Sequence, residues 1–339
     1  MKRFITLTQL ILIVFLSLVQ NSFAGDEEEG VSFTYENDVF RNTDRSYTNG
    51  VRLSWISAEN NLPKFIQPFA DYLLNPTANL FPLFPKDGKR RISYALGQSM
   101  FTPDDIKTST LVTEDRPYAG WLYGSMGFTS DNGKHLDYLE LTLGVVGSAS
   151  LAEQTQDFVH KHITGSPIAQ GWDNNQLDNE PGIMLMYEHK WRNLYEYSPF
   201  GVGLDFTPHA GLSMGNIFTH AAFGGTVRLG YDLPSDYGPP RVRPSISGTD
   251  FFNPSKNVAW YLFAGTEGRA VARNIFLDGN TFSDSHSVDK KYLIGDFQAG
   301  AALTYKNTRL SYTHVIRTKE YESQDSGDRF GAINLSVKF

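Results

Sequence analysis

Apolar and polar residues alternate along most of the chain, and this pattern predicts a sheet of many strands. The alternation is clearest over residues 201–213. One face there holds Val202, Leu204, Phe206, Ala210 and Leu212, and the other holds Gly203, Asp205, Thr207, His209 and Gly211. Such a polar face would be costly in a core that is apolar on both sides, but it is natural around a polar lumen. This segment therefore indicates the wall of a barrel.

The same alternation predicts twelve strands, at 31–38, 49–57, 91–99, 120–129, 137–146, 182–193, 201–213, 221–232, 257–277, 292–305, 308–318 and 330–339. Residues 265–269, Gly-Thr-Glu-Gly-Arg, resemble a hairpin turn that would give thirteen strands. Because single-chain bacterial barrels have even strand numbers, we interpret 257–277 as one long strand with a glycine bend. We expect an all-β fold, a transmembrane antiparallel β-barrel with short helices in extracellular loops, whose closure leaves no sheet edge.

Two long connections interrupt the strands. Residues 58–90 are rich in Pro, Asn and Leu, and a short helix is expected around Pro63–Leu74. Residues 147–181 contain SLAEQTQDFVHKHI, which predicts a helix capped by Ser150, with Glu153 three residues later as in a capping box.

Gly165 and Pro167 should end this second helix. Gln156 and His160 are four residues apart, so they share one face, whereas Phe158 points elsewhere.

The first 24 residues predict a secretory signal peptide. Lys2 and Arg3 precede an apolar run from residue 4 to 19, and the small residues Ser22 and Ala24 follow. This run is shorter than the about 20 residues of a membrane span. We expect cleavage after Ala24, which leaves residues 25–339 as a single barrel domain.

The last residues alternate as well. Gly331, Ile333, Leu335, Val337 and Phe339 lie on one face, which fits the closing strand of an outer-membrane barrel, although a soluble edge strand could alternate in the same way. Together with the signal peptide, this strand predicts the bacterial outer membrane as the location.

Composition narrows the function classes. The net charge is −7, and it would become −9 after loss of the signal peptide. This acidic balance argues against nucleic acid as a partner. The absence of cysteine excludes cysteine nucleophiles and thiolate metal sites. The aromatic fraction of 14% suits the aromatic girdles of a barrel.

Polar side chains, most of them with oxygen atoms, are concentrated in TYENDVFRNTDRSYTNGVRLSW, residues 34–55. The set comprises Glu36, Asn37, Asp38, Asp44, Arg45, Thr48 and Asn49. Oxygen-rich clusters suit calcium, which takes six to eight oxygen ligands, although the spacing is not that of an EF-hand. An ordinary polar hairpin loop and a catalytic centre are the other interpretations.

His160 and Ser213 are the candidate catalytic side chains. His160 beside Gln156 on a helix docked to the barrel wall could be a water-activating base, whereas a lone loop histidine is more often solvated. Ser213 lies in GLSMG, residues 211–215, which fits the nucleophile-elbow pattern. That motif requires a strand-to-helix turn, and no helix is indicated after it.

Several motifs occur in an order that resembles one family. They are ENDVFRNTDRSYTNGVRLSW, GQSMFTPDD, EDRPYAGWLYGSMGF, QTQDFVHKHITGSPIAQGWDNNQL and FLDGNTF. Together they resemble the lipid A 3′-O-deacylases, LpxR, of Gram-negative outer membranes, over residues 31–339. The resemblance implies a twelve-stranded barrel. It also implies calcium-dependent hydrolysis of the 3′-linked acyloxyacyl ester of lipid A, with lipopolysaccharide as substrate and outer-membrane lipid as surroundings. We expect a monomer.

The resemblance also implies roles for individual residues. Asn37, Thr48, Gln156 and His160 would be catalytic, and Asp38 with Asn37 would hold Ca²⁺. His160 would take a proton from water as in secreted phospholipase A2, since an imidazole with an ordinary pKa of about 6.5 suits that work at neutral pH. Lys107 is the nearest candidate for a basic residue, but its spacing from Pro103 differs from the family pattern.

Two other functions remain open at this point. One is a serine-dependent outer-membrane phospholipase or esterase that uses Ser213 with His220. The other is a non-catalytic barrel, for which a wide pore is not expected because the inward side chains of twelve strands largely fill the lumen.

Overall fold

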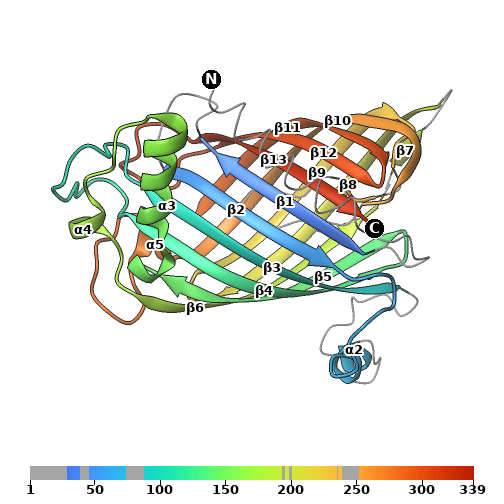
Figure 1. Cartoon of the computed structure of the whole chain (residues 1–339), viewed down its shortest axis with the longest axis horizontal. Coiled ribbons are helices and arrows are strands. Elements are labelled where there is room, and N and C mark those ends of the chain that lie inside the picture. The colour runs from blue at the N-terminus through green and yellow to red at the C-terminus, as the bar shows by residue number, and fades with distance from the viewer. Residues whose placement is uncertain are drawn as a thin grey trace.

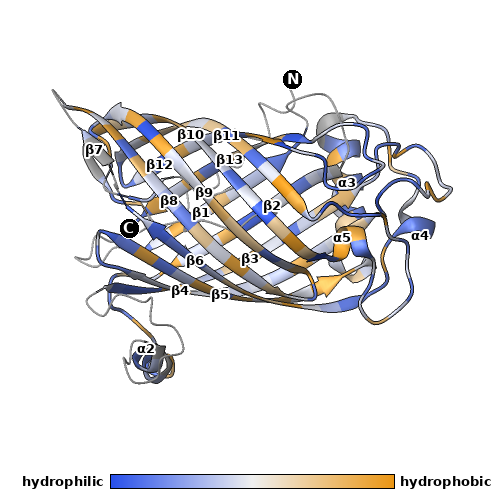
Figure 2. Cartoon of the chain, turned by 180° about the vertical axis from the view of Figure 1, so that it is seen from behind, coloured by the Kyte–Doolittle hydropathy of each residue, from blue (hydrophilic) through white to orange (hydrophobic). Residues whose placement is uncertain are grey.

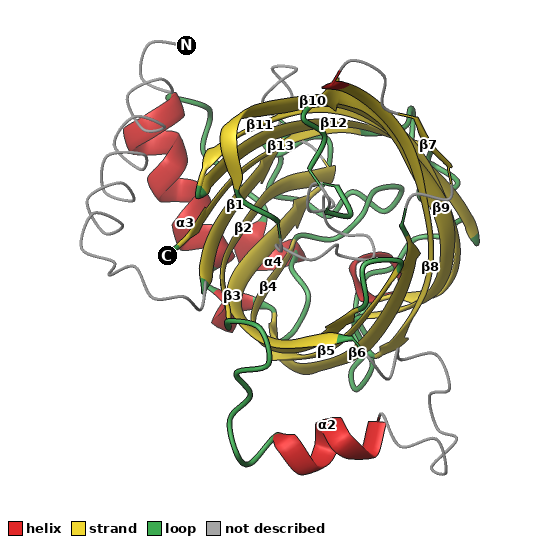
Figure 3. Cartoon of the chain, turned by 90° about the vertical axis from the view of Figure 1, so that its right-hand side faces the viewer, coloured by secondary structure: helices red, strands yellow, loops and turns green. Residues whose placement is uncertain are grey.

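The chain forms a closed antiparallel barrel in a computed structural model that describes residues 29–38, 46–73, 88–192, 195–197, 201–234, 236–238 and 252–339. Figures 1 and 3 show the barrel from the side and along its axis. Its twelve strands are β1 (Gly30–Asn37), β2 (Ser46–Ile56), β3 (Lys89–Thr102), β4 (Ala119–Asp131), β5 (His135–Val146), β6 (Glu180–Trp191), β8 (Val202–Gly215), β9 (Phe218–Tyr231), β10 (Ser255–Asn274), β11 (Leu293–Lys306), β12 (Thr308–Arg317) and β13 (Arg329–Lys338).

Strand pairing closes the wall at two places. β1 pairs with β13, and β6 pairs with β8, so the wall has no open edge. The three-residue strand β7 (Tyr195–Tyr197) adds only a short extension beside β8. β10 runs unbroken through residues 265–269, which confirms the single long strand and the count of twelve. The predicted signal peptide lies outside the described residues.

The two faces of the wall have the predicted polarity. On β8, Val202, Phe206 and Leu212 are exposed on the outside, whereas Asp205 and His209 are buried inside. Hydrophobic and hydrophilic residues alternate in the same way along the other strands (Figure 2). The outside is therefore apolar and the inside polar, as lipid around a filled barrel requires.

Ion pairs fill the lumen. Arg228 donates to Asp205 at 2.9 Å and also pairs with Asp236, which in turn pairs with Arg309. Arg52 on β2 reaches Glu140 on β5 at 2.7 Å, so this pair crosses the interior. Arg269 on β10 and Arg317 on β12 both donate to Asp296 on β11, the strand between them. Inward charged side chains therefore occupy part of the lumen and bind one another across neighbouring and more distant strands.

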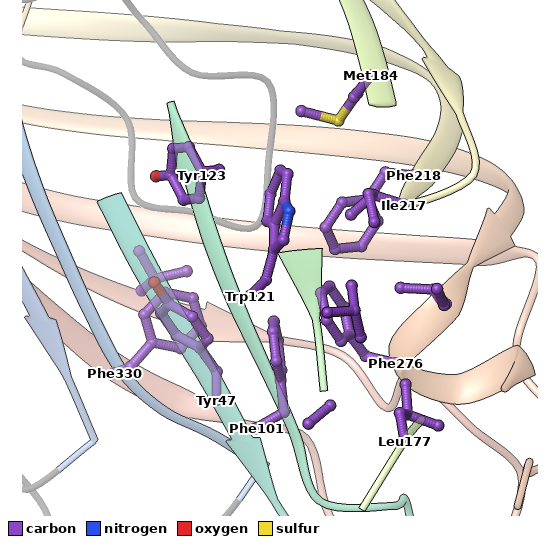
Figure 4. Close-up of a cluster of buried hydrophobic side chains, with 14 of the residues drawn as sticks. Tyr47, Phe101, Trp121, Tyr123, Leu177, Met184, Ile217, Phe218, Phe276 and Phe330 are labelled. Atoms are coloured by element: carbon purple, nitrogen blue, oxygen red, sulfur yellow. The ribbon is translucent and has the colours of Figure 1, made fainter. Parts of the chain in front are cut away.

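A cluster of buried apolar side chains, many of them aromatic, lies beside the short helix at one end of the barrel (Figure 4). The short helix α5 (Ile275–Asp278) follows β10 and places Phe276 among inward side chains of the wall. The ring of Phe276 stacks on Phe101 at 4.0 Å between centroids and also contacts Phe218 and Trp121. The end beside α5 is thus filled with apolar side chains.

The remaining helices lie in the connections. α2 (Gln67–Leu73) is shorter than the predicted helix around Pro63–Leu74. The connection from β5 to β6 contains the 3-10 turn η2 (Ser148–Ser150), α3 (Ala152–Val159), the π-helical turn η3 (His160–Thr164) and α4 (Trp172–Asn175). Gly165 ends this run in the left-handed conformation, with φ 73°, as predicted. Among the described residues, no helix is long and apolar enough to span a membrane.

The predicted capping box is wrong. Leu151, with a left-handed φ of 60°, precedes α3, and no side chain caps the helix. The hydroxyl of Ser150 instead donates to the carbonyl oxygen of Gly147 at 2.5 Å within the preceding turn. Because Ser150 is packed against the wall and bonded within its own turn, it cannot reach the amide of Glu153.

Replacement of Arg228 by methionine should destabilise the barrel by about 3–5 kcal/mol, since buried Asp205 would lose its arginine partner and buried Asp236 would keep only Arg309. We expect a clear fall in the temperature at which the folded band disappears in a heat-modifiability gel. Arg90→Met is the matched control, because the Arg90–Asp71 pair is largely exposed. Equal unfolding temperatures for the two variants would contradict a stabilising role of the lumen pair.

Candidate active site

Buried polar side chains mark one place on the outside of the wall. Asn37, Thr48, Asn49 and Thr102 occupy outward positions near the ends of β1, β2 and β3, yet all four are buried. Outward residues farther along these strands are exposed: Leu53 is 48% exposed and Leu96 is 61% exposed. The segment that includes α3 covers this part of the wall: α3 packs against β3 and β4 and lies outside the ring of strands (Figures 1 and 3).

Hydrogen bonds join the polar residues of the wall. The Asn37 side-chain amide donates to the backbone oxygen of Thr48 at 2.9 Å, and the hydroxyls of Thr48 and Thr102 lie 2.7 Å apart. Thr48 sits where the pairing of β2 with β3 shifts by one residue, which is a β-bulge. Asp38 follows directly after β1 and is also buried. The bulge and the end of β1 thus bring Asn37, Asp38 and Thr48 to one edge.

On the helix side, Gln156 and His160 are 2% and 3% exposed, whereas Phe158 between them is 58% exposed. Gln156 on α3 and His160 at the start of η3 are therefore both turned away from solvent, as their spacing predicted, and His160 is not a solvated loop histidine. His160 Nδ1 lies 2.6 Å from the carbonyl oxygen of Pro167, which can only accept. Nδ1 consequently holds the proton in the neutral ring, and Nε2 holds the lone pair.

A small apolar cluster joins the wall to the helix. Met100 pairs across the sheet with Asn49, and its side chain packs with Ala152 and Trp172 in a cluster with Ile106, Tyr118 and Ala169. The Gln98 side chain adds a hydrogen bond of 2.7 Å to the backbone oxygen of Ser150. Met100 therefore lies between the wall residues and the helix residues of the site.

Ionisable groups around the helix have shifted pKa values. Burial raises the pKa of Tyr118 to about 12, so its hydroxyl stays protonated near neutral pH. Burial, and then the nearby Asp173 and Asp157, raise the pKa of Glu153. Acidic side chains thus surround the start of α3, whereas the nearby Tyr118 hydroxyl is neutral.

The other predicted residues lie apart from this group. Lys107 is exposed, and its backbone amide donates to Asp105. Glu36 faces the lumen, where it accepts from the Tyr47 hydroxyl. Ser213 and His220 face each other across β8 and β9 inside the barrel. Asp44 and Arg45 lie outside the described residues.

Three further residues belong to the site. Thr102 contacts Thr48, Pro167 orients His160, and Trp172 donates from Nε1 to Gln156 Oε1 at 2.6 Å. Thr102 has a sequence signal, since period two places it on the outward face with Gln98 and Met100. Pro167 and Trp172 meet His160 and Gln156 only through tertiary contacts, which the spacing of residues along the sequence does not indicate.

No group of three or more His, Cys, Asp or Glu suited to a metal occurs among the described residues. Asp38 and Asn37 are adjacent in sequence and each carries a side-chain oxygen, and the amino group of Asn37 donates to the backbone oxygen of Thr48. Oxygen donors of this kind fit a hard cation such as calcium.

Comparisons with known proteins agree on one family. The family model described as "Outer membrane protein LpxR" matches residues 10–339. The solved structure of LpxR from Salmonella typhimurium matches with a TM-score of 0.71 at 19% identity, covering 91% of this chain and 99% of that one. The β domain of the Bordetella autotransporter BrkA covers 92% and 98%, at 10% identity, but its TM-score of 0.42 is too low to support an argument. A search of curated proteins found no match.

Gly120→Ala should displace α3 from the wall. A Cβ at Gly120 would overlap Ser150 Oγ and Ala152 Cβ, so the start of the helix would have to move. We expect faster hydrogen–deuterium exchange in residues 152–164. Gly124→Ala, on the same face of β4, is the control, because its Cβ would meet only a backbone oxygen at 3.8 Å. Unchanged exchange in Gly120→Ala would show that α3 does not depend on this close approach.

Proposed function

The chain belongs to the LpxR family of outer membrane proteins, and we propose that it hydrolyses the 3′-linked acyloxyacyl ester of lipid A. Family membership and the twelve-stranded barrel confirm the predicted location in the bacterial outer membrane. Lipopolysaccharide would be the natural substrate, because its acyl chains lie in the outer leaflet beside the barrel wall.

One observation supports the proposal above the others. A histidine and a glutamine on a helix outside the barrel are buried against a wall whose outward positions are polar instead of apolar. A structural barrel gains nothing from burying polar side chains on its lipid side, because each must then be satisfied. A lipid-hydrolysing enzyme needs polar groups at this position, since the ester bonds of its substrate lie in the membrane.

His160 would be the general base. Pro167 holds the proton on Nδ1, so Nε2 can take a proton from a water molecule as the water oxygen attacks the ester carbonyl carbon. When the tetrahedral species collapses, the bond between this carbon and the sugar oxygen breaks. His160 returns the proton to the leaving oxygen, and the products are a carboxylic acid and a sugar hydroxyl.

Asp38 and Asn37 would hold a calcium ion. Such an ion acts as a Lewis acid that stabilises negative charge on an ester oxygen. The backbone oxygen of Thr48 accepts a hydrogen bond from the Asn37 side-chain amide, so Thr48 would hold Asn37 in position as a calcium ligand. Thr102, bonded to Thr48, would support the same arrangement.

The alternatives have weaker support. The Ser213 hydroxyl donates to the backbone oxygen of Phe218 at 3.1 Å and lies inside the barrel, away from the lipid. The ion pairs of the lumen and the aromatic cluster around Phe276 argue against a pore.

His160→Ala should abolish lipid A deacylation, with a loss of about 10²- to 10⁴-fold, because the general base would be missing. Mass spectrometry of lipid A from cells that express each variant measures the loss of the acyloxyacyl group. His162→Ala, on the exposed side of the same segment, and Ser213→Ala should keep activity. Activity that is lost in Ser213→Ala and kept in His160→Ala would favour the serine mechanism, and a wild-type chain that leaves lipid A intact would refute the proposed function.

Chelation of calcium should stop the reaction of the purified protein, and added calcium should restore it. Asp38→Asn should raise the calcium concentration needed for half-maximal activity by at least roughly tenfold, since it removes a charged ligand. Asp157→Asn, an exchange of the same kind on α3, should leave this concentration unchanged. Full activity of the wild type in excess chelator would rule out the metal.

A further inference from the structure

The orientation of the Gln156 side chain is fixed by its partner. The indole Nε1 of Trp172 can only donate, and it lies 2.6 Å from Gln156 Oε1. The oxygen of the carboxamide must therefore face Trp172, and the amino group must face the other way. Nε2 is buried, and within the described part of the chain it has no hydrogen-bond partner.

Trp172 is itself held firmly. It is buried, and its ring packs on Tyr118 with centroids 4.9 Å apart. Gly171, just before it, allows this contact, because a Cβ there would overlap the Tyr118 ring. The Tyr118 amide donates to the backbone oxygen of Asn175, and the Leu177 amide donates to that of Tyr118. The short helix α4 is thereby tied to the start of β4, and with it the indole.

A buried donor without a partner is unfavourable, and proteins keep such groups chiefly where a ligand completes them. Gln156 lies one turn before His160 on the same buried side of α3. A ligand that reaches Nε2 from this side would therefore lie beside the imidazole.

We propose that Trp172 is a positioning residue that holds the Gln156 carboxamide in one orientation, so that Nε2–H donates to the carbonyl oxygen of the ester that is cleaved. This inference rests on the proposed function. The hydrogen bond strengthens as negative charge develops on that oxygen during attack by water. If the carboxamide rotated by half a turn, Gln156 Oε1 would face the ester carbonyl oxygen and would repel the negative charge that develops there.

Two substitutions separate the two roles. Trp172→Phe keeps the donor but removes the group that orients it, and kcat should fall about tenfold with little change in KM. Gln156→Glu keeps an acceptor for Trp172 but has no N–H donor, and kcat should fall about 10²-fold. Trp172→Phe added to Gln156→Glu should cause no further loss, because Trp172 acts only through Gln156.

Trp121→Phe is the matched control. Trp121 is also a buried indole, but its Nε1 has no hydrogen-bond partner among the residues that the structure describes, and it lies in the aromatic cluster inside the barrel. It should leave kcat unchanged. If Trp172 mattered only for packing, Trp172→Phe would lower activity equally in the wild type and in Gln156→Glu, and that result would overturn the proposal.

A second readout does not need activity. The chain has five tryptophans, so indole ¹⁵N labelling gives five resonances, and the one missing in Trp172→Phe is that of Trp172. Gln156→Leu should move this resonance upfield, whereas Gln156→Glu should leave it downfield. An unmoved resonance in Gln156→Leu would disprove the Trp172–Gln156 bond. A wild type that cleaves no lipid A would refute the ester as acceptor together with the proposed function, while the resonance would still decide whether Trp172 holds Gln156.

Discussion

The structure depends on the pairing of charges inside a wall whose outside is apolar. A barrel in lipid reverses the arrangement of a soluble protein, because its buried space is polar and its exposed surface is not. Arg228 shows what this demands, since it binds Asp205 and Asp236, and Asp236 also binds Arg309. Such groups are tolerable in a lumen only when every charge has a partner. A chain without cysteine obtains its rigidity from these contacts and from backbone pairing around a closed sheet.

Against this background the polar outer positions stand out. Along most of the wall the outward residues are apolar and exposed, as for Leu53 and Leu96. At Asn37, Thr48 and Thr102 the outward residues are polar, and the segment that contains α3 removes them from contact with lipid. The helix thus has two consequences for the same place. It hides polar groups that lipid could not solvate, and it turns His160 and Gln156 away from solvent.

The strands could be predicted from the sequence because period two is imposed at nearly every position by the contrast between lipid and lumen. The predicted ends of two strands were wrong at the place where the outer face of the wall no longer meets lipid. β3 was expected to stop at residue 99 but continues to Thr102, and β2 begins at Ser46, three residues earlier than expected. These extra residues lie under the segment that covers the site, so their outward side chains need not be apolar. The placement of Gln156 and His160 on one face followed from helical spacing, whereas Trp172 and Pro167 meet them only through the folded loop.

The aromatic cluster around Phe276 affects the route by which a substrate would reach the site. Apolar side chains occupy that end of the lumen, so the middle of the protein offers an unfavourable path for a polar head group to the space beneath α3. Under the proposed function, a lipid would reach the site laterally, by diffusion within its own leaflet, and the deacylated lipid would leave by the same route. The speed of turnover would then be tied to how freely neighbouring lipids exchange places, so a leaflet whose head groups are cross-linked by cations would slow the protein without altering a single residue.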